Sequence, residues 1–123
     1  MSFLPDQVQR CRFCSQHTAL SERPSIATTQ PIFHEPHEGA YLGQCKTCGA
    51  AYLVYWLEYR DDTLSYFCLM TSSDLAFLEE RRSTNLLTST EVRACIVEHE
   101  VFAVSPWGAK WERGVFLPSP TPW

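Results

Sequence analysis

The chain lacks a long hydrophobic run and any excess of basic charge. Its strongest apolar segment, residues 50–57, is far too short to cross a bilayer, which takes about 20 helical residues. The N-terminal residues have neither the basic region nor the apolar stretch of a secretory signal peptide, so we expect a cytoplasmic protein that does not bind membranes. Ten Lys and Arg against fourteen Asp and Glu give a net charge of −4 without a basic stripe, which argues against a nucleic-acid partner.

Sequence signatures of catalysis are also lacking. The chain contains no glycine-rich phosphate loop and no Ser/His/Asp arrangement with a local signature. Glu58, Asp61 and Asp62 are the only close group of carboxylates, and they fall at a strand end and a turn, where such groups are usually solvated. We therefore expect that the protein is not an enzyme.

The composition is that of a globular domain. Hydrophobic residues make up 45% of the 123 residues, which suits one domain spanning residues 1–123. Recurring prolines among Ser, Thr and Gln predict that residues 19–38 form a long connection without regular structure. Prolines also make residues 118–123 a tail that suits neither a helix nor a strand.

Four of the six cysteines form two C-x2-C pairs, Cys11 with Cys14 and Cys45 with Cys48. In a reducing compartment such pairs indicate metal binding, because two tight turns can aim four thiolates at one tetrahedral zinc ion. Gly49 follows the second pair and tolerates the unusual dihedral angles of such a turn. A zinc ion closed by four protein ligands has no position for water, so we expect a structural site.

Other assignments of the cysteines and histidines remain open. His17 can replace one cysteine as a ligand, and the pairs can instead be packed thiols or a redox dithiol. Cys68 and Cys95 are expected in the core and His99 on a helix face. The run from His34 to Glu38 is expected in a surface loop, because Pro36 interrupts the helix that an H-E-x-x-H motif needs.

Periodicity predicts an α+β fold, a zinc-ribbon-like antiparallel sheet with two helices packed on it. Residues 50–59 are apolar on both faces and predict a central strand that buries Trp56 and Leu57 on opposite sides. A turn at residues 60–62 and strand formers over residues 63–71 complete a hairpin. One helix is expected from an N-cap within residues 72–74 to Arg82, and a second after the capping-box spacing of residues 88–91. Residues 101–105 and 110–116 can form a late hairpin.

Residues 43–80 resemble a group of small, mostly uncharacterised bacterial zinc-ribbon-like proteins. The likeness rests on the segment Cys45-Lys46-Thr47-Cys48-Gly49, the aromatic strand over residues 52–58, an acidic turn, a second strand and a short acidic helix. The turn is shorter here than in that group. The resemblance implies a zinc knuckle, and some proteins of this kind are immunity proteins that neutralise a toxin.

These observations favour a noncatalytic zinc-binding module that binds another protein, such as a cognate toxin. The residues expected to bind the partner are Glu58, Asp61, Asp62, Trp107 and Trp111, because acidic side chains speed association with a basic cleft and exposed aromatics anchor it. These carboxylates can equally be solvated on a turn, and the tryptophans can pack against the hairpin. One alternative function is a zinc ribbon that contacts nucleic acid or the transcription machinery. A second is a small metalloenzyme with an open metal position, using His34 or His37 with two cysteines.

Overall fold

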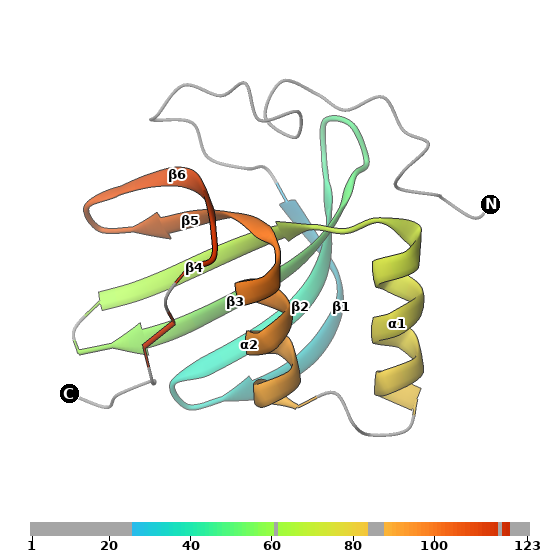
Figure 1. Ribbon diagram of the computed structural model, residues 1–123, viewed down its shortest axis with the longest axis horizontal. Coiled ribbons are helices and arrows are strands. Elements are labelled where there is room, and N and C mark those ends of the chain that lie inside the picture. The colour runs from blue at the N-terminus through green and yellow to red at the C-terminus, as the bar shows by residue number, and fades with distance from the viewer. Residues whose placement is uncertain (1–25, 61, 84–87, 116, 119–123) are drawn as a thin grey trace.

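A computed structural model of the chain describes residues 26–60, 62–83, 88–115 and 117–118. They form one antiparallel sheet in which six strands lie side by side in chain order, together with two helices (Figure 1). The elements are β1 (Ile26–Glu35), β2 (Glu38–Cys45), β3 (Ala51–Tyr59), β4 (Asp62–Leu69), α1 (Ser72–Ser83), α2 (Ser89–Glu98), β5 (Glu100–Ser105) and β6 (Gly108–Arg113). The predicted α+β class, with an antiparallel sheet and two helices, is confirmed.

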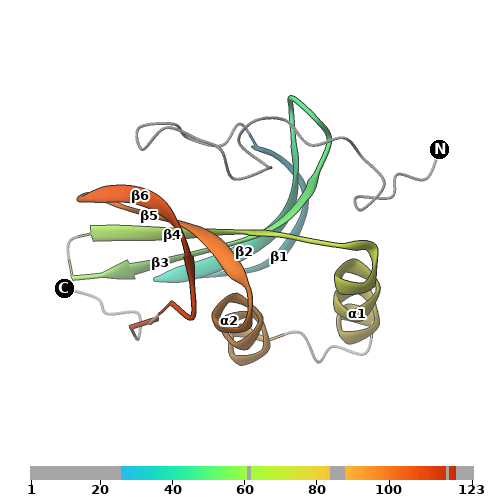
Figure 2. The same cartoon turned by 45° about the horizontal axis from the view of Figure 1, so that its top comes forward.

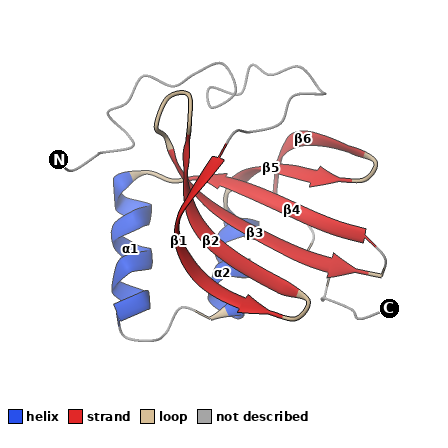
Figure 3. Ribbon diagram, turned by 180° about the vertical axis from the view of Figure 1, so that it is seen from behind, coloured by secondary structure: helices blue, strands red, loops and turns tan. Residues whose placement is uncertain are grey.

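Tight turns explain why the strand order follows the chain. Strand partners Glu35 and Glu38, Tyr59 and Asp62, and Ser105 and Gly108 each leave two residues between them. Two-residue loops of this kind join antiparallel neighbours directly. Both helices are inserted between β4 and β5, which nevertheless pair with each other (Figure 3).

The third strand is central, as predicted. β3 pairs with β2 on one side and with β4 on the other. Leu53, Tyr55 and Leu57 are fully buried in the cluster that includes residues of both helices, and Tyr52 belongs to a second cluster formed by the alternate residues. Burial on both faces explains the continuous apolar run. Of the two residues expected to be buried on opposite faces, Leu57 is fully buried and Trp56 is partly buried.

Both helices cover the same face of the sheet (Figure 2). Leu78 of α1 and Val92 and Ile96 of α2 are buried in the cluster that includes Tyr55. Over the described residues, neither helix has the length and apolar character needed to span a membrane. The predicted extents of the helices agree closely with those observed.

The caps of the helices differ from those predicted. At α1, the backbone N–H of Thr71 donates to Oδ2 of Asp74 at 3.0 Å, and the N–H of Asp74 donates to Oγ1 of Thr71 at 3.2 Å. This reciprocal pair is a capping box with aspartate in place of glutamate. Thr88 precedes α2 in an extended conformation but makes no side-chain cap hydrogen bond. The functioning capping box is therefore at residues 71–74 and not at residues 88–91.

The prediction that residues 19–38 form an irregular connection is wrong over residues 26–38, where β1, a turn and the start of β2 lie. Pro31 has no N–H group, and β1 tolerates it because β1 is an edge strand of the described sheet. Shifts in register at residues 28–30 and 31–33 accommodate the irregular sequence. Residues 26–35 therefore form a strand because they pair with β2, since no alternation of apolar residues in the sequence indicates one. Residues 19–25 and 119–123 lie outside the described part.

Candidate metal centre

The second C-x2-C pair lies at the junction of β2 and β3, where Cys45 ends β2 and Cys48 lies in the turn that follows. The N–H of Gly49 donates to the carbonyl of Cys45 at 2.8 Å, and the N–H of Cys45 donates to the carbonyl of Ala50 at 2.8 Å. Gly49 has φ of +80°, the left-handed conformation that glycine adopts without penalty. Cys45 is buried and Cys48 partly buried. The turn therefore has the compact form expected of half a zinc site, and its two sulfurs suit zinc chemically.

The other half of the predicted zinc site is the pair Cys11 and Cys14. Cys11, Cys14 and the alternative ligand His17 lie outside the described residues. The four-cysteine site therefore stays a prediction.

Among the described residues, Cys68, Cys95 and His99 form a group that is close enough to bind a metal ion. The two Sγ atoms and a ring nitrogen all lie within 4.8 Å of one another. Cys68 is fully buried on β4, whereas Cys95 and His99 lie one helical turn apart at the end of α2 and are partly exposed. Side chains at positions i and i+4 share one face of a helix, which brings the last two together over the strand. The metal is not identified.

Asp74 extends this group from α1. Its Oδ2 atom accepts from the N–H and the hydroxyl of Thr71, each at 3.0 Å, while its Oδ1 atom lies 3.3 Å from Nε2 of His99. The other ring nitrogen, Nδ1, lies 2.8 Å from the carbonyl of Cys95 and 3.8 Å from its Sγ. The capping box thus holds a carboxylate against the histidine, and the imidazole bridges α1 and α2.

The two thiols of the group are not equivalent. Hydrogen bonding to Cys95 together with burial raises the pKa of Cys68 far above its usual value. The pKa of Cys95 is lowered, chiefly because Cys68 donates to it and also because His99 is close, although burial opposes this. Cys95 is therefore the thiol that ionises first, with Cys68 as its hydrogen-bond donor.

Charge pairing governs the other two groups. Burial alone would lower the pKa of His99, but its contacts with the Cys95 carbonyl and Asp74 outweigh burial and raise it. Burial likewise opposes ionisation of Asp74, but hydrogen bonds from Thr71 and His99 lower its pKa. Both shifts favour the charged forms of His99 and Asp74, whose Nε2 and Oδ1 atoms lie 3.3 Å apart.

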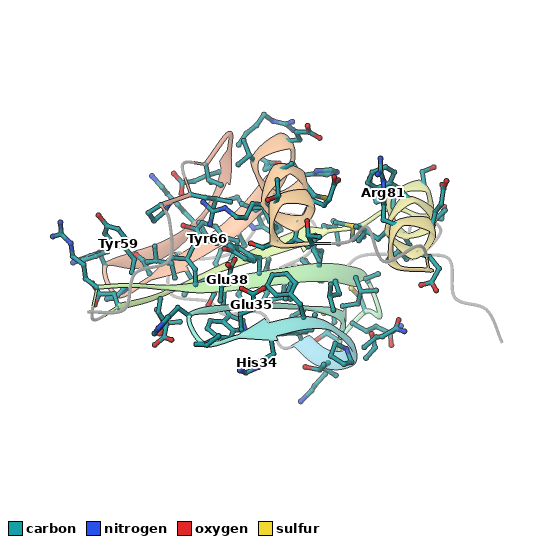
Figure 4. The ribbon with its side chains drawn as sticks, turned by 90° about the horizontal axis from the view of Figure 1, so that it is seen from below. His34, Glu35, Glu38, Tyr59, Tyr66 and Arg81 are labelled. Atoms are coloured by element: carbon teal, nitrogen blue, oxygen red, sulfur yellow. The ribbon has the colours of Figure 1, made fainter. Side chains whose placement is uncertain are left out.

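A polar network positions α2 above the sheet. The hydroxyl of Tyr55 donates to Oε1 of Glu38 at 2.7 Å, and the hydroxyl of Ser89 donates to the same oxygen at 2.6 Å. Arg93 donates from Nη1 to the Tyr55 hydroxyl at 2.8 Å and from Nη2 to the carbonyls of Leu117 and Pro118. Figure 4 shows Glu38 between the sheet and α2. This network fixes the helix that carries Cys95 and His99.

The acidic residues expected to bind a partner lie at the end of β3 remote from Cys45. Glu58 is partly buried, and its Oε1 atom lies 3.4 Å from Nδ1 of His37. Asp62 begins β4, and Asp61 lies outside the described residues. Nine residues of β3 separate this turn from the cysteine turn, about 30 Å at the rise of a strand.

The two tryptophans expected on the same surface have different environments. Trp107 is 78% exposed at the turn between β5 and β6. Trp111 was expected to be exposed, but it is partly buried. Its ring packs edge-to-face on that of Phe102, with centroids 5.5 Å apart. Alternation along β6 places Trp111 beside Phe102 on the face opposite the helices, whereas Trp107 borders a groove on the helix-covered face.

The run from His34 to Glu38 is not a surface loop. His34 belongs to β1, and His37 lies in the two-residue turn that leads to β2. Figure 4 shows His34 pointing away from the helices, and its ring lies 5.6 Å from that of Trp56. Both histidines are at the end of β2 opposite Cys45, so they do not complete a metal site with the cysteine turn.

The expectation that Cys68 and Cys95 are buried core residues is correct for Cys68, whereas Cys95 is only partly buried, and it missed their relation to His99. The spacing Cys95-x3-His99 places two donors on one helix face, and this signal is present in the sequence. Cys68 and Asp74, however, join them only through the packing of β4 and α1 against α2. No family model, curated protein or solved structure matches the chain.

Proposed function

We propose that the protein is a noncatalytic zinc-binding module that binds another protein, and that it acts as an immunity or antitoxin-like protein by occupying a toxin. Cys11, Cys14, Cys45 and Cys48 would hold a structural zinc ion, and the compact Cys45–Gly49 turn supports this and the likeness to zinc ribbons. The zinc ion would stabilise one end of the sheet, and the partner would bind at the other end.

The observation that carries this proposal is the exposure of Trp107. Its side chain is 78% exposed beside a groove of about 710 Å³, whose wall includes Leu64, Tyr66, Ala103 and Val115. Tryptophan is strongly enriched among the residues that dominate the energetics of protein–protein interfaces. A rigid indole next to a concave, largely apolar surface is therefore well suited to anchor a partner.

The charge at the same end of the sheet favours a basic partner. The turn between β3 and β4, with Glu58 and Asp62, lies at the same end as the turn that carries Trp107 (Figure 1). The whole chain has a net charge of −4. Acidic groups beside an aromatic anchor would accelerate association with the basic substrate cleft of a nuclease.

A photo-crosslinking residue at position 107 tests the surface directly. We expect it to capture a defined protein partner in cells, whereas the same residue at position 77 should not. Phe77 is a matched control because it is 47% exposed, but lies on α1 at the other side of the molecule (Figure 1). If the captured protein is a toxin, its expression alone should stop growth, and coexpression of the present chain should restore it.

Binding kinetics with the purified partner provide the quantitative test. Trp107→Ala should raise the dissociation rate about 30-fold, which corresponds to an anchor contribution of about 2 kcal/mol. Phe77→Ala should leave the dissociation rate unchanged. Asp62→Lys should slow association and flatten its dependence on salt, whereas Glu80→Lys on α1 should do so much less.

Three outcomes would refute the proposal. Equal crosslinking from positions 107 and 77 would show that the exposed indole is not the anchor. Capture of RNA polymerase or nucleic acid would favour the zinc ribbon of the transcription machinery. Turnover of a small substrate by the purified chain without a partner would favour a metalloenzyme.

A further inference from the structure

The group of Cys68, Cys95 and His99 lies apart from the cysteine turn. Cys68 belongs to the buried cluster beneath the helices, whereas Cys45 and Cys48 belong to the cluster on the opposite face of the sheet. We propose that Cys68, Cys95 and His99 form a second zinc site, with three protein ligands, one open coordination position, and Asp74 orienting the histidine. This inference does not depend on the proposed function.

The spacing of the donors fits a tetrahedral zinc ion. Bonds of about 2.3 Å to sulfur and 2.0–2.1 Å to nitrogen place two sulfurs about 3.8 Å apart and a sulfur and a nitrogen about 3.6 Å apart. Nδ1 of His99 lies 3.8 Å from Sγ of Cys95, and all three donor atoms fall within 4.8 Å. To close the site, Nδ1 of His99 has to leave the carbonyl of Cys95, 2.8 Å away, and turn toward the two sulfurs.

The position of Asp74 is the strongest sign that His99 is a ligand. Histidines that bind metals almost always donate their other ring N–H to a carboxylate or a carbonyl, which fixes the ring and its tautomer. Here Nε2 faces Oδ1 of Asp74 at 3.3 Å, which leaves Nδ1 on the side of Cys95, 2.8 Å from its carbonyl and 3.8 Å from its Sγ. Thr71 holds the other oxygen of this carboxylate, so the support is fixed before any metal binds.

The donor chemistry selects the metal class. Two thiolates and one imidazole suit zinc, whereas magnesium and calcium require oxygen ligands. Asp74 is held by Thr71 and directed at the far side of the imidazole, so three protein donors are in place and the fourth position is left for water or a small ligand. Cys95 and His99 are only partly buried, so solvent can reach this position.

Cadmium substitution of the reduced full-length protein tests the site, because the NMR signal of cadmium reports the number of sulfur ligands. We expect one signal from a site with four sulfurs and a second from a site with two sulfurs. His99→Gln should abolish the second signal and leave the first, whereas His34→Gln should leave both. Retention of the first signal and of the circular dichroism spectrum shows that the variant is folded.

Two further measurements separate a metal site from a histidine that merely joins two helices. Asp74→Asn should weaken zinc binding at this site about 10- to 100-fold, the usual effect of losing a supporting carboxylate, while Glu79→Gln should not. Added imidazole should shift only the signal that depends on His99, because only that site has an open position. A structural histidine would produce neither effect.

The outcomes for the two zinc sites are distinguishable. A single cadmium signal that His99→Gln removes would support the second site and refute the site with four cysteines. Signals that are all unaffected by His99→Gln would overturn the inference made here. The inference would also be overturned if protein isolated from cells with a reducing cytoplasm contained a Cys68–Cys95 disulfide and bound no metal through His99. That result would assign the two cysteines to redox chemistry.

Discussion

The hydroxyl group of Tyr55 links β3 to both β2 and α2, and its removal tests how the helix that carries Cys95 is held on the sheet. This hydroxyl donates to Glu38 at 2.7 Å and accepts from Arg93 at 2.8 Å. Tyr55→Phe removes both hydrogen bonds but keeps the ring, over which the Arg93 guanidinium lies 5.8 Å from the centroid. The substitution therefore isolates the contribution of one oxygen atom.

The expected loss of stability is about 2 kcal/mol. Hydrogen bonds to charged groups contribute about 1.5–3 kcal/mol each, so two of them set an upper bound well above this value. The actual loss is smaller because Glu38 keeps its bond from Ser89 at 2.6 Å, and Arg93 keeps the carbonyls of Leu117 and Pro118. For a domain of 123 residues, 1 kcal/mol corresponds to about 4 °C in Tm, so we expect Tm to fall by about 8 °C.

Urea and thermal unfolding of the purified protein measure this effect. Tyr66→Phe is the matched control, because the Tyr66 ring stacks on that of Tyr55 at 6.4 Å but its hydroxyl is not part of the Glu38–Tyr55–Arg93 network. The control should change stability less than Tyr55→Phe does, because it removes neither the hydrogen bond to Glu38 nor the one from Arg93. Equal effects of the two substitutions would show that the network does not hold α2 on the sheet.

Three other substitutions test the core, a close backbone contact and the predicted zinc site. Leu57→Ala should cost about 2–5 kcal/mol in urea unfolding, because the side chain is fully buried in the central strand; a loss below 1 kcal/mol would contradict that packing. Gly39→Ala should cost about 1–3 kcal/mol, since a Cβ atom there would lie 2.6 Å from Nε1 of Trp56, and Gly39→Ala combined with Trp56→Leu should recover part of the loss. Cys45→Ser should remove one zinc per chain and loosen the fold, because structural zinc contributes about 10–16 kcal/mol of apparent binding energy against a total domain stability of about 5–15 kcal/mol. Unchanged circular dichroism and zinc content in Cys45→Ser would refute a zinc site at the turn.

The sequence alone determined the elements with strong local signals. The apolar run from Ala51 to Tyr59 identified the central strand, because only a strand covered on both sides is apolar on both faces. Polar clusters placed the β3–β4 turn, and amphipathic spacing with Ser, Thr and Asp at the start located both helices. Each of these signals arises within a few residues, so it survives without knowledge of the fold.

The tertiary structure alone decided the features that depend on distant residues. β1 is a strand because β2 supplies its hydrogen-bond partners, and nothing in the local pattern around Pro31 marks it. Trp107 and Trp111 look alike in the sequence, but the alternation of side chains across β6 buries one against Phe102 while the turn exposes the other.

The same holds for the candidate metal site. Cys68 and His99 lie 31 positions apart in the sequence, and the group Cys68, Asp74, Cys95 and His99 comes from β4, α1 and the C-terminal end of α2. Only the spacing of Cys95 and His99 is a local signal, because Cys95 lies in the last turn of α2 and His99 is its C-cap residue, four positions on. Packing of α1 and α2 on one face of the sheet brings Cys68 and Asp74 close to Cys95 and His99. This proximity depends on long-range contacts that no local pattern encodes.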